Sequence, residues 1–227
     1  MYVLDNPIWN ALITGNKAFS LGNEHARYYD REMGAFAGLK NNKGSELDSL
    51  LNLTPFETPV VLFTPGEIEI SSNWKVNVKR PLLQMVFENK NAIVPDLSDL
   101  KPLTQENIEA MIDLTGRTKP GPFLSRTIEF GNYMGIFDNN RLVAMTGQRL
   151  QPDPYTEISA VCTDPEYTGK GYAAKLIMDQ VKKIKAVSRI PFLHLFSDNM
   201  PAYNLYKKQG FQTRKEMLVY VLEKQRD

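Results

Sequence analysis

The sequence predicts a mixed α/β fold, and three observations carry that prediction. Short apolar runs bounded by proline, glycine or charged residues recur along the chain, which is typical of strands. Between them lie segments with apolar residues three and four positions apart, which is typical of amphipathic helices. Hydrophobic residues make up 42% and charged residues 23% of the 227 residues, the balance of a protein that buries its own core.

The second half of the chain carries the clearest pattern. Its first helix begins after Thr104, a favourable N-cap, and is expected to end at Gly116. Three strands, a helix, a strand, a helix and a last strand follow. In that order they are predicted over residues 133–137, 141–150, 155–163, 171–187, 191–196, 200–209 and 217–222.

The first half of the chain has weaker periodicity and no recognisable chemical motif. The predicted elements are one or two helices over residues 6–21, a helix over 45–53, and strands over 60–63 and 83–87. The segment 95–102 contains two prolines and precedes a capped helix, so it is a candidate boundary. We therefore predict a smaller N-terminal α/β region of unknown role over residues 1–99 and a second domain over residues 100–227.

Charge and composition exclude several classes of protein. Lys and Arg total 27 and Asp and Glu total 26, a net charge of +1, which excludes the strongly basic field of a nucleic-acid-binding protein. No run approaches the roughly 18 apolar residues of a membrane-spanning helix, and the N-terminus lacks the basic start of a signal peptide. The single cysteine, Cys162, excludes an internal disulfide and a cysteine zinc cluster. We expect a reduced, cytoplasmic protein with no membrane or nucleic-acid partner.

A glycine-containing loop over residues 168–172 joins a predicted strand to a predicted helix. Glycines let a backbone approach a ligand closely, and a helix N-terminus offers unpaired N–H groups, so such a loop can bind phosphate. A tight connection without a ligand is the alternative. A P-loop is excluded because position 164 is Asp instead of Gly and Lys170 is followed by Gly171 instead of Ser or Thr. The loose dinucleotide pattern Gly169-x-Gly171-x-x-Ala174 is present, but five residues separate it from the strand that it should follow directly.

The segments 161–173, with Gly171 and Ala173, and 198–211, with Asn199 and Tyr206, resemble two motifs of the GNAT superfamily, the GCN5-related N-acetyltransferases. The segment 161–173 resembles the family's acyl-CoA-binding motif, Gln/Arg-x-x-Gly-x-Gly/Ala. Gly171 and Ala173 match this motif, and Thr168 stands where Gln or Arg is usual. The segment 198–211 resembles the signature Asn-x-x-Ala-x-x-Leu-Tyr-x-x-x-Gly-Phe. The two motifs come in the family's order, and the chain is most similar to bacterial members with an extra N-terminal region.

The resemblance implies a site for an acyl-CoA donor. In this family the strand before the glycine loop separates from the next strand, and the pantetheine arm lies between them. Backbone groups of Val161 and Thr163 would contact that arm and the thioester carbonyl, and an N–H aimed at this carbonyl would stabilise the developing oxyanion. The implied donor-binding residues are Val161, Cys162, Thr163, Thr168, Gly169, Lys170, Gly171, Tyr172, Ala173 and Asn199. Asn199 would contact the donor or cap its helix, and no metal is implied.

The resemblance also implies two catalytic residues. Glu157 is similar to the base glutamate of the histone acetyltransferase branch, and in an alternating strand it would share a face with Ser159 and Val161. Tyr206 matches the tyrosine that protonates the leaving thiolate. From the residues alone, a solvated strand carboxylate and a tyrosine packed on the sheet are the alternatives. His194 is predicted to be a core or half-buried histidine. Arg126 is a candidate contact to the acceptor, and a simple Pro-Gly turn in this loop is the alternative.

The activity implied by the resemblance is transfer of an acetyl group from acetyl-CoA to a primary amine of a small-molecule or peptide acceptor. The amine would attack directly in a ternary complex, and the protein would be a monomer or homodimer. A non-catalytic acyl-CoA-binding module, a transferase of longer acyl chains and a dinucleotide-binding oxidoreductase are the alternatives.

Overall fold

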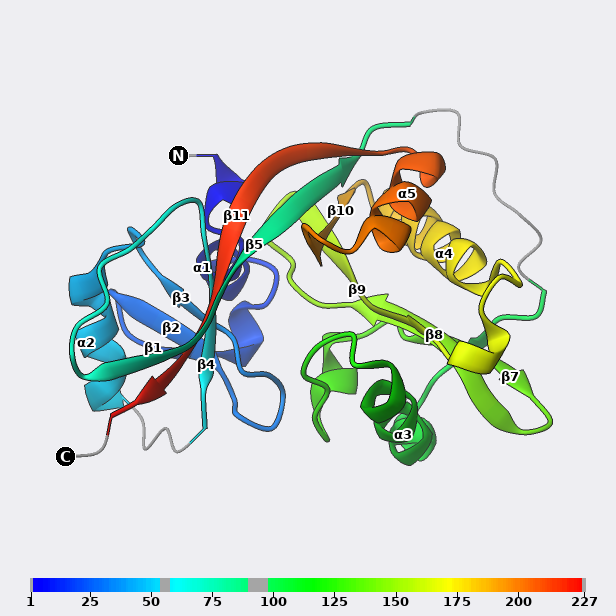
Figure 1. Cartoon of the computed structure of the whole chain (residues 1–227), viewed down its shortest axis with the longest axis horizontal. Helices are drawn as coiled ribbons and strands as arrows, with labels where there is room; N and C mark the ends of the chain where they lie inside the picture. Colours follow the sequence, from blue (N-terminus) through cyan, green and yellow to red (C-terminus); the bar gives the residue numbers. More distant parts are fainter. Residues whose placement is uncertain (1, 54–57, 90–97, 226–227) are drawn as a thin grey trace.

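A long antiparallel pair of strands, β5 (Trp74–Phe87) and β11 (Phe211–Lys224), runs between two lobes and joins them (Figure 1). The computed structural model describes residues 2–53, 58–89 and 98–225. One lobe holds the N-terminal elements, the beginning of β5 and the end of β11. The other holds the remaining helices and strands of the second half of the chain.

One mixed sheet of eight strands, in the order β4-β11-β5-β10-β9-β8-β7-β6, spans both lobes. Only the β9–β10 pair is parallel among its described neighbours. The other strands are β4 (Val60–Thr64), β6 (Lys101–Pro102), β7 (Met134–Asp138), β8 (Arg141–Gln148), β9 (Tyr155–Thr163) and β10 (Ile190–Phe196). The mixed α/β class predicted from the sequence is confirmed.

The sheet is continuous across the division predicted near residue 100. The strands β4 and β5 precede that division, whereas β10 and β11, with which they pair, follow it. The beginning of the proposed boundary segment, residues 95–97, lies outside the described residues. The two parts therefore share hydrogen-bonded strands as well as packed side chains.

Helices cover both faces of the sheet (Figure 1). The helix α3 (Ile108–Thr118) packs on one face of β8 and β9, and α4 (Tyr172–Ala186) packs on the other. The helix α5 (Met200–Gln209) lies beside α4. The first lobe adds α1 (Pro7–Ile13), α2 (Gly44–Leu53) and a small antiparallel sheet of β1 (Ser20–Gly22), β2 (Ala26–Tyr29) and β3 (Ala37–Leu39). Short 3₁₀ turns occur at Val3–Asp5, Lys17–Phe19, Gln105–Asn107, Thr127–Phe130 and Pro165–Tyr167.

One predicted helix end is wrong and three short strands were missed, both for local reasons. The helix α3 continues through Gly116 and ends at Thr118, with Lys119 in the left-handed conformation donating its N–H to the Thr115 carbonyl. A glycine inside a helix costs only about 1 kcal/mol, which packing and neighbouring pairs can offset. The strands β1 to β3 were not predicted, because three or four residues are too few to show a period.

The long strands β5 and β11 also extend well beyond the predicted 83–87 and 217–222. The first part of β5 is charged and largely exposed, so no apolar run marks it. Its hydrogen bonds to β11 continue from Phe211↔Phe87 to Lys224↔Trp74 and hold it extended.

Among the described residues, no helix is both long and apolar enough to cross a lipid bilayer.

Candidate active site

The strand β9 separates from β10 part-way along its length. Their parallel pairing covers Ile190↔Tyr155, Pro191↔Thr156 and Phe192↔Glu157, and then ends. Beyond this point β10 stays paired with β5, while β9 stays paired with β8. The second half of β9 therefore turns one edge of its backbone toward a gap in the sheet, as the resemblance implied.

The register identifies which backbone groups face that gap. The Asp164 N–H donates to the Val143 carbonyl at 2.8 Å, so Asp164 points its backbone toward β8. Strand alternation then directs the N–H and C=O of Thr163 and Val161 to the opposite edge. The Thr163 side-chain Oγ1 is buried and has no hydrogen-bond partner among the described residues. Val161 and Thr163 thus offer backbone groups where the sequence predicted a donor arm.

A bulge at Ala160 changes the faces of β9. Ala160 has φ of 51°, and the pairing shifts between Met145 and Gly147 on β8. As a result, Val161 packs with Ile158 against α4, on the face opposite to Glu157. The predicted common face of Glu157, Ser159 and Val161 is wrong, because strict alternation stops at the bulge. Cys162 packs on the α3 side, where burial raises the pKa of its thiol to about 11.

The glycine loop has the geometry of an anion-binding turn. Gly169 and Gly171 both have φ of 79°, and a Cβ added at either would meet no atom within 4 Å. Gly171 is the N-cap of α4, so the first N–H groups of that helix point out of the loop. Thr168 donates its hydroxyl to the Pro165 carbonyl at 3.0 Å, which closes the preceding turn. Lys170 lies over the ring of Tyr167. The residues present fit a phosphate group held by backbone N–H donors.

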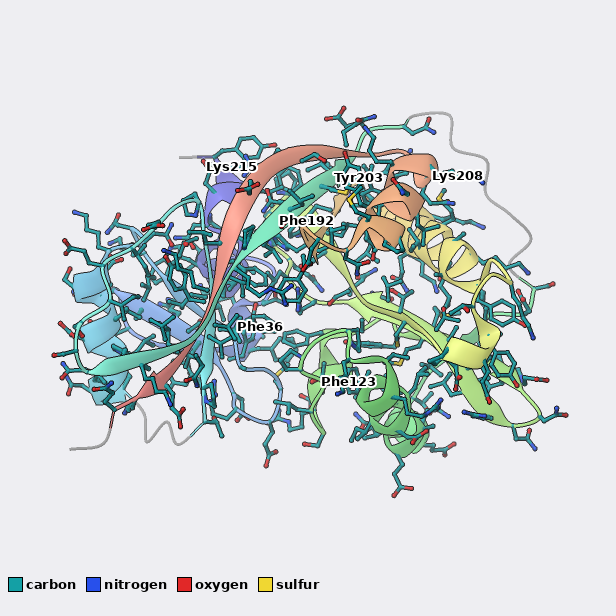
Figure 2. All side chains as sticks on the ribbon, in the orientation of Figure 1. Phe36, Phe123, Phe192, Tyr203, Lys208 and Lys215 are labelled. Atoms are coloured by element: carbon teal, nitrogen blue, oxygen red, sulfur yellow. The ribbon has the colours of Figure 1, made fainter. Side chains whose placement is uncertain are left out.

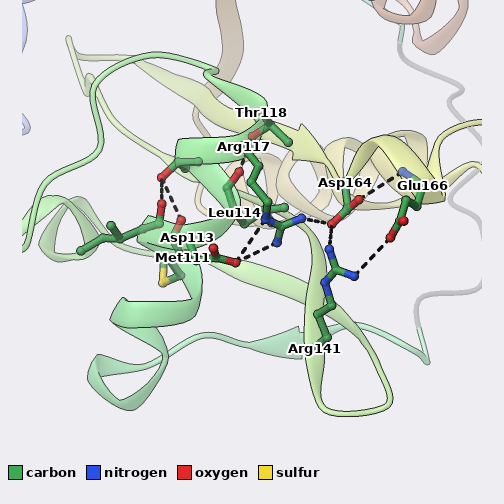
Figure 3. A network of polar contacts seen from close by, with 10 residues as sticks. Met111, Asp113, Leu114, Arg117, Thr118, Arg141, Asp164 and Glu166 are labelled. Atoms are coloured by element: carbon green, nitrogen blue, oxygen red, sulfur yellow. Dashed lines mark hydrogen bonds and ion pairs between the residues drawn. The ribbon is translucent and has the colours of Figure 1, made fainter.

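A buried carboxylate anchors the beginning of this loop (Figure 3). Asp164 is 1% exposed and forms ion pairs with Arg117 of α3 and Arg141 of β8. Its other oxygen accepts the Glu166 N–H at 3.1 Å and so caps the 3₁₀ turn that leads to the glycines. Asp164 therefore ties the loop to the helix α3 and to the strand β8.

Replacing Asp164 with asparagine is expected to lower the free energy of unfolding by about 1.5–3 kcal/mol, because the cap survives while the hydrogen bonds to a buried charge are weakened. Denaturant titration measures this difference. The control is Glu166→Gln, since Glu166 is an exposed partner of Arg141 and its loss should cost no more than about 1 kcal/mol. Equal losses in the two variants would contradict the anchoring role.

Glu157 lies in a buried polar network and is not solvated. Its Oε2 and Oε1 accept from Arg149 Nε at 2.8 Å and Nη2 at 2.7 Å, a two-pronged ion pair. Oε1 also accepts from His194 Nδ1 at 2.7 Å, and Oε2 accepts the Leu150 N–H at 3.3 Å. Burial raises the pKa of Glu157, but the Arg149 charge and these hydrogen bonds outweigh it and hold the pKa at about 2.

The partners of His194 determine where its proton lies. Gln84 accepts from Arg214 at Oε1, so its Nε2 donates to His194 Nε2 at 2.9 Å. His194 therefore carries its proton on Nδ1 and donates it to Glu157. Burial lowers the pKa of His194 in spite of the neighbouring carboxylate. The prediction that His194 is a buried residue is confirmed.

Tyr206 and Asn199 lie at opposite ends of α5. Asn199 caps the helix by accepting the Ala202 N–H at 3.2 Å, which is one of its two predicted roles. Tyr206 is 7% exposed and packs edge-to-face on Phe211 in the cluster that also holds Val161. Burial raises the pKa of the Tyr206 phenol to about 12, so it keeps its proton at neutral pH. Packing in this cluster and proton donation are compatible roles for Tyr206.

A small pocket, open on one side, lies between the lobes. The first lobe contributes Met33 and Phe36, the loop after α3 contributes Phe123, and β9 contributes Ser159 and Ala160 at the bulge. Figure 2 shows Phe36 on the first lobe and Phe123 on the loop beside α3.

Arg126 and Arg149 differ in their relation to this pocket. Arg126 does not line it, because its guanidinium pairs with Glu129 at 2.7 Å and Asp30 at 3.4 Å. Arg149 does line it, and sequence reasoning missed this residue. Arg149 lies near the end of the strand predicted over residues 141–150, with no distinguishing motif beside it. Nothing in the sequence indicates that Phe36 would lie across from Phe123.

Comparison with known proteins assigns the family. A family model described as FR47-like protein matches residues 133–220. A structure of a protein from Novosphingobium aromaticivorans, assigned to the GNAT family of acetyltransferases, superposes with a TM-score of 0.91 at 30% identity and covers 100% of both chains. The chain belongs to the GNAT family. This membership confirms the predicted resemblance and supports transfer of an acyl group from an acyl-CoA.

More distant GNAT structures share the fold. A GCN5-related N-acetyltransferase from Kribbella flavida has a TM-score of 0.63 at 13% identity, covering 93% of this chain and 92% of its own. An acetyltransferase of the family from Colwellia psychrerythraea has a TM-score of 0.55 at 15% identity, covering 95% of this chain and 97% of its own. A search of curated protein sequences found no match.

Proposed function

We propose that this GNAT protein transfers an acetyl group from acetyl-CoA to a primary amine by direct attack in a ternary complex. The observation that carries the proposal is the separation of β9 from β10 after Glu157, directly before the glycine loop at the start of α4. An extended thioester fits such a gap, and its phosphates would meet the helix N-terminus. A cytoplasmic location is part of the same proposal.

The donor would be held mainly by backbone groups. The N–H and C=O groups of Val161 and Thr163 face the gap and would pair with the amide-rich arm of CoA. The N–H groups of residues 169–173 would hold the pyrophosphate, since both glycines leave open space there. Thr168 uses its hydroxyl within the turn, so the position where Gln or Arg is usual contributes through its backbone.

The acidity of Glu157 bears on how the acceptor loses its proton. Moving a proton from an alkylammonium of pKa about 10.4 to a carboxyl of pKa about 2 is uphill by roughly 11 kcal/mol. Losing that proton to water at pH 7 is uphill by only about 4.6 kcal/mol. We therefore propose that Glu157 holds Arg149 and His194 in place and that the proton leaves to solvent through the open side of the pocket.

Tyr206 is proposed as the acid that donates to the leaving thiolate. A CoA thiolate resembles that of cysteine, with a pKa of about 8.5, and gains from a hydrogen-bond donor as the carbon–sulfur bond breaks. The phenol is protonated at neutral pH and lies in the cluster that includes Val161 of the separated strand.

Isothermal titration with acetyl-CoA tests the donor site. We expect a micromolar dissociation constant, no comparable binding of NAD, and a loss of about tenfold or more in affinity for Gly171→Glu, whose side chain would enter the phosphate space. The matched control is Gly131→Glu, because Gly131 also has positive φ and open space but lies outside the loop. Turnover is then tested by measuring the release of the free CoA thiol in the presence of a panel of primary amines.

Three results would count against the proposal. Absence of acetyl-CoA binding, or equal losses in both glycine variants, would remove the donor site. Tight binding without turnover of any amine would indicate a non-catalytic acyl-CoA-binding module.

A further inference from the structure

We infer that the acceptor is a primary amine carried on an apolar, aromatic body with no second cationic group, and that it binds in the pocket between the lobes. This inference rests on the proposed function. It gives the N-terminal region a role in choosing the acceptor, because that region supplies part of the pocket wall.

The position of the pocket links it to the reacting end of the donor. Its wall includes Ser159 and Ala160, at the bulge two to three residues after β9 parts from β10. Ala160 faces the α3 side of the sheet, whereas the glycine loop leads into α4 on the other side. An amine in the pocket can therefore approach the gap from the face opposite to α4.

The walls of the pocket are apolar and aromatic. Phe123 packs edge-to-face on Tyr133, with ring centroids 5.7 Å apart, and both line the pocket. Met33 and Phe36 contribute from the first lobe, and Phe130 from the 3₁₀ turn. Aromatic and apolar lining side chains of this kind favour a ligand with an aromatic body.

The charge of the pocket selects against polycations. None of the described residues that line it is Asp or Glu, and its one charged lining residue is Arg149. The Glu157 carboxylate, which pairs with Arg149, also accepts from His194 and is therefore already engaged. The face of Phe36 is covered by the Arg149 guanidinium at 4.5 Å, so it is not available to a second cation. A polyamine would place an extra ammonium beside Arg149 without a counter-charge.

The test compares phenethylamine with spermidine as ligands of the protein saturated with CoA. By isothermal titration we expect phenethylamine to bind about tenfold or more tightly than spermidine. The Phe123→Ala variant should weaken phenethylamine binding by about tenfold while leaving the affinity for acetyl-CoA unchanged. The control is Phe137→Ala, because Phe137 is also partly buried on the same apolar cluster but does not line the pocket.

Turnover measurements separate this inference from the proposed function. The inference is supported if kcat/KM is higher for phenethylamine than for spermidine. It is also supported if Phe123→Ala lowers kcat/KM for phenethylamine by raising KM. Preference for spermidine in binding or turnover overturns it while leaving the acetyl-CoA-dependent activity intact. An effect of Phe123→Ala on the KM for hexanoyl-CoA, with phenethylamine unaffected, also overturns it, since the pocket would then hold the acyl chain.

Discussion

Replacing Glu157 with glutamine is expected to lower the free energy of unfolding by about 3–5 kcal/mol. The substitution keeps the shape of the side chain but leaves the Arg149 guanidinium buried without its counter-charge. The Arg149 side chain is only 16% exposed and that of Glu157 is fully buried, so water cannot replace the lost partner. A loss of this size would make the buried Glu157 pair a main contributor to the stability of the fold.

The control for this prediction is Glu129→Gln. Glu129 forms the same two-pronged pair with Arg126, at 2.7 and 2.9 Å, but both side chains are partly exposed. We expect that variant to lose no more than about 1 kcal/mol. Denaturant titration of the wild type and both variants measures the difference, and a small, equal loss would show that burial of the Glu157 pair is unimportant.

The same network predicts that stability falls as the pH falls. The folded-state pKa of His194 is below its ordinary value of 6.5, so its contribution is complete above pH 6.5 and is lost as the pH falls. The folded-state pKa of Glu157 is about 2 against 4.5, so its contribution is complete above pH 4.5 and is lost as the pH approaches 2. Glu157→Gln should remove the part of the pH dependence below 4.5. If the free energy of unfolding of that variant still falls in the same way below pH 4.5, other carboxylates are responsible for this pH dependence.

Replacing Tyr206 with phenylalanine is expected to lower kcat by about 100-fold, the lower range for loss of a positioned acid. The dissociation constant of acetyl-CoA should stay within about twofold, because the ring that packs on Phe211 is kept. Steady-state kinetics and titration calorimetry measure the two quantities. The matched control is Tyr203→Phe on the same helix, where kcat should not change.

The raised pKa of Tyr206 adds a pH criterion. Because the phenol keeps its proton below about pH 12, the wild-type rate should show no alkaline limb from Tyr206 between pH 7 and 10. An unchanged kcat in Tyr206→Phe would leave Tyr206 with a packing role alone.

The elements that the sequence predicted best are those in which one local pattern decides the outcome. The strand β9 and the helix α5 have the predicted bounds, because a bounded apolar run and a capped helix ended by a left-handed glycine are properties of a short segment. The glycine loop belongs to the same class, since its positive φ values need glycine whatever surrounds it. The motifs on these elements were enough to indicate the family.

Tertiary structure decided the features that depend on partners far apart in the chain. The first part of β5 is extended because β11 pairs with it, although its own residues are charged and exposed. Glu157 is a weak base because Arg149 and His194 contact it in a buried site. The sequence does not show which residues will contact a carboxylate in the folded protein. The sequence by itself thus determined the family, the glycine loop and the helices around it. Only the fold brought Phe36 to Phe123 and Arg149 to Glu157, because burial and long-range contact set the shape of a pocket and the pKa of a side chain.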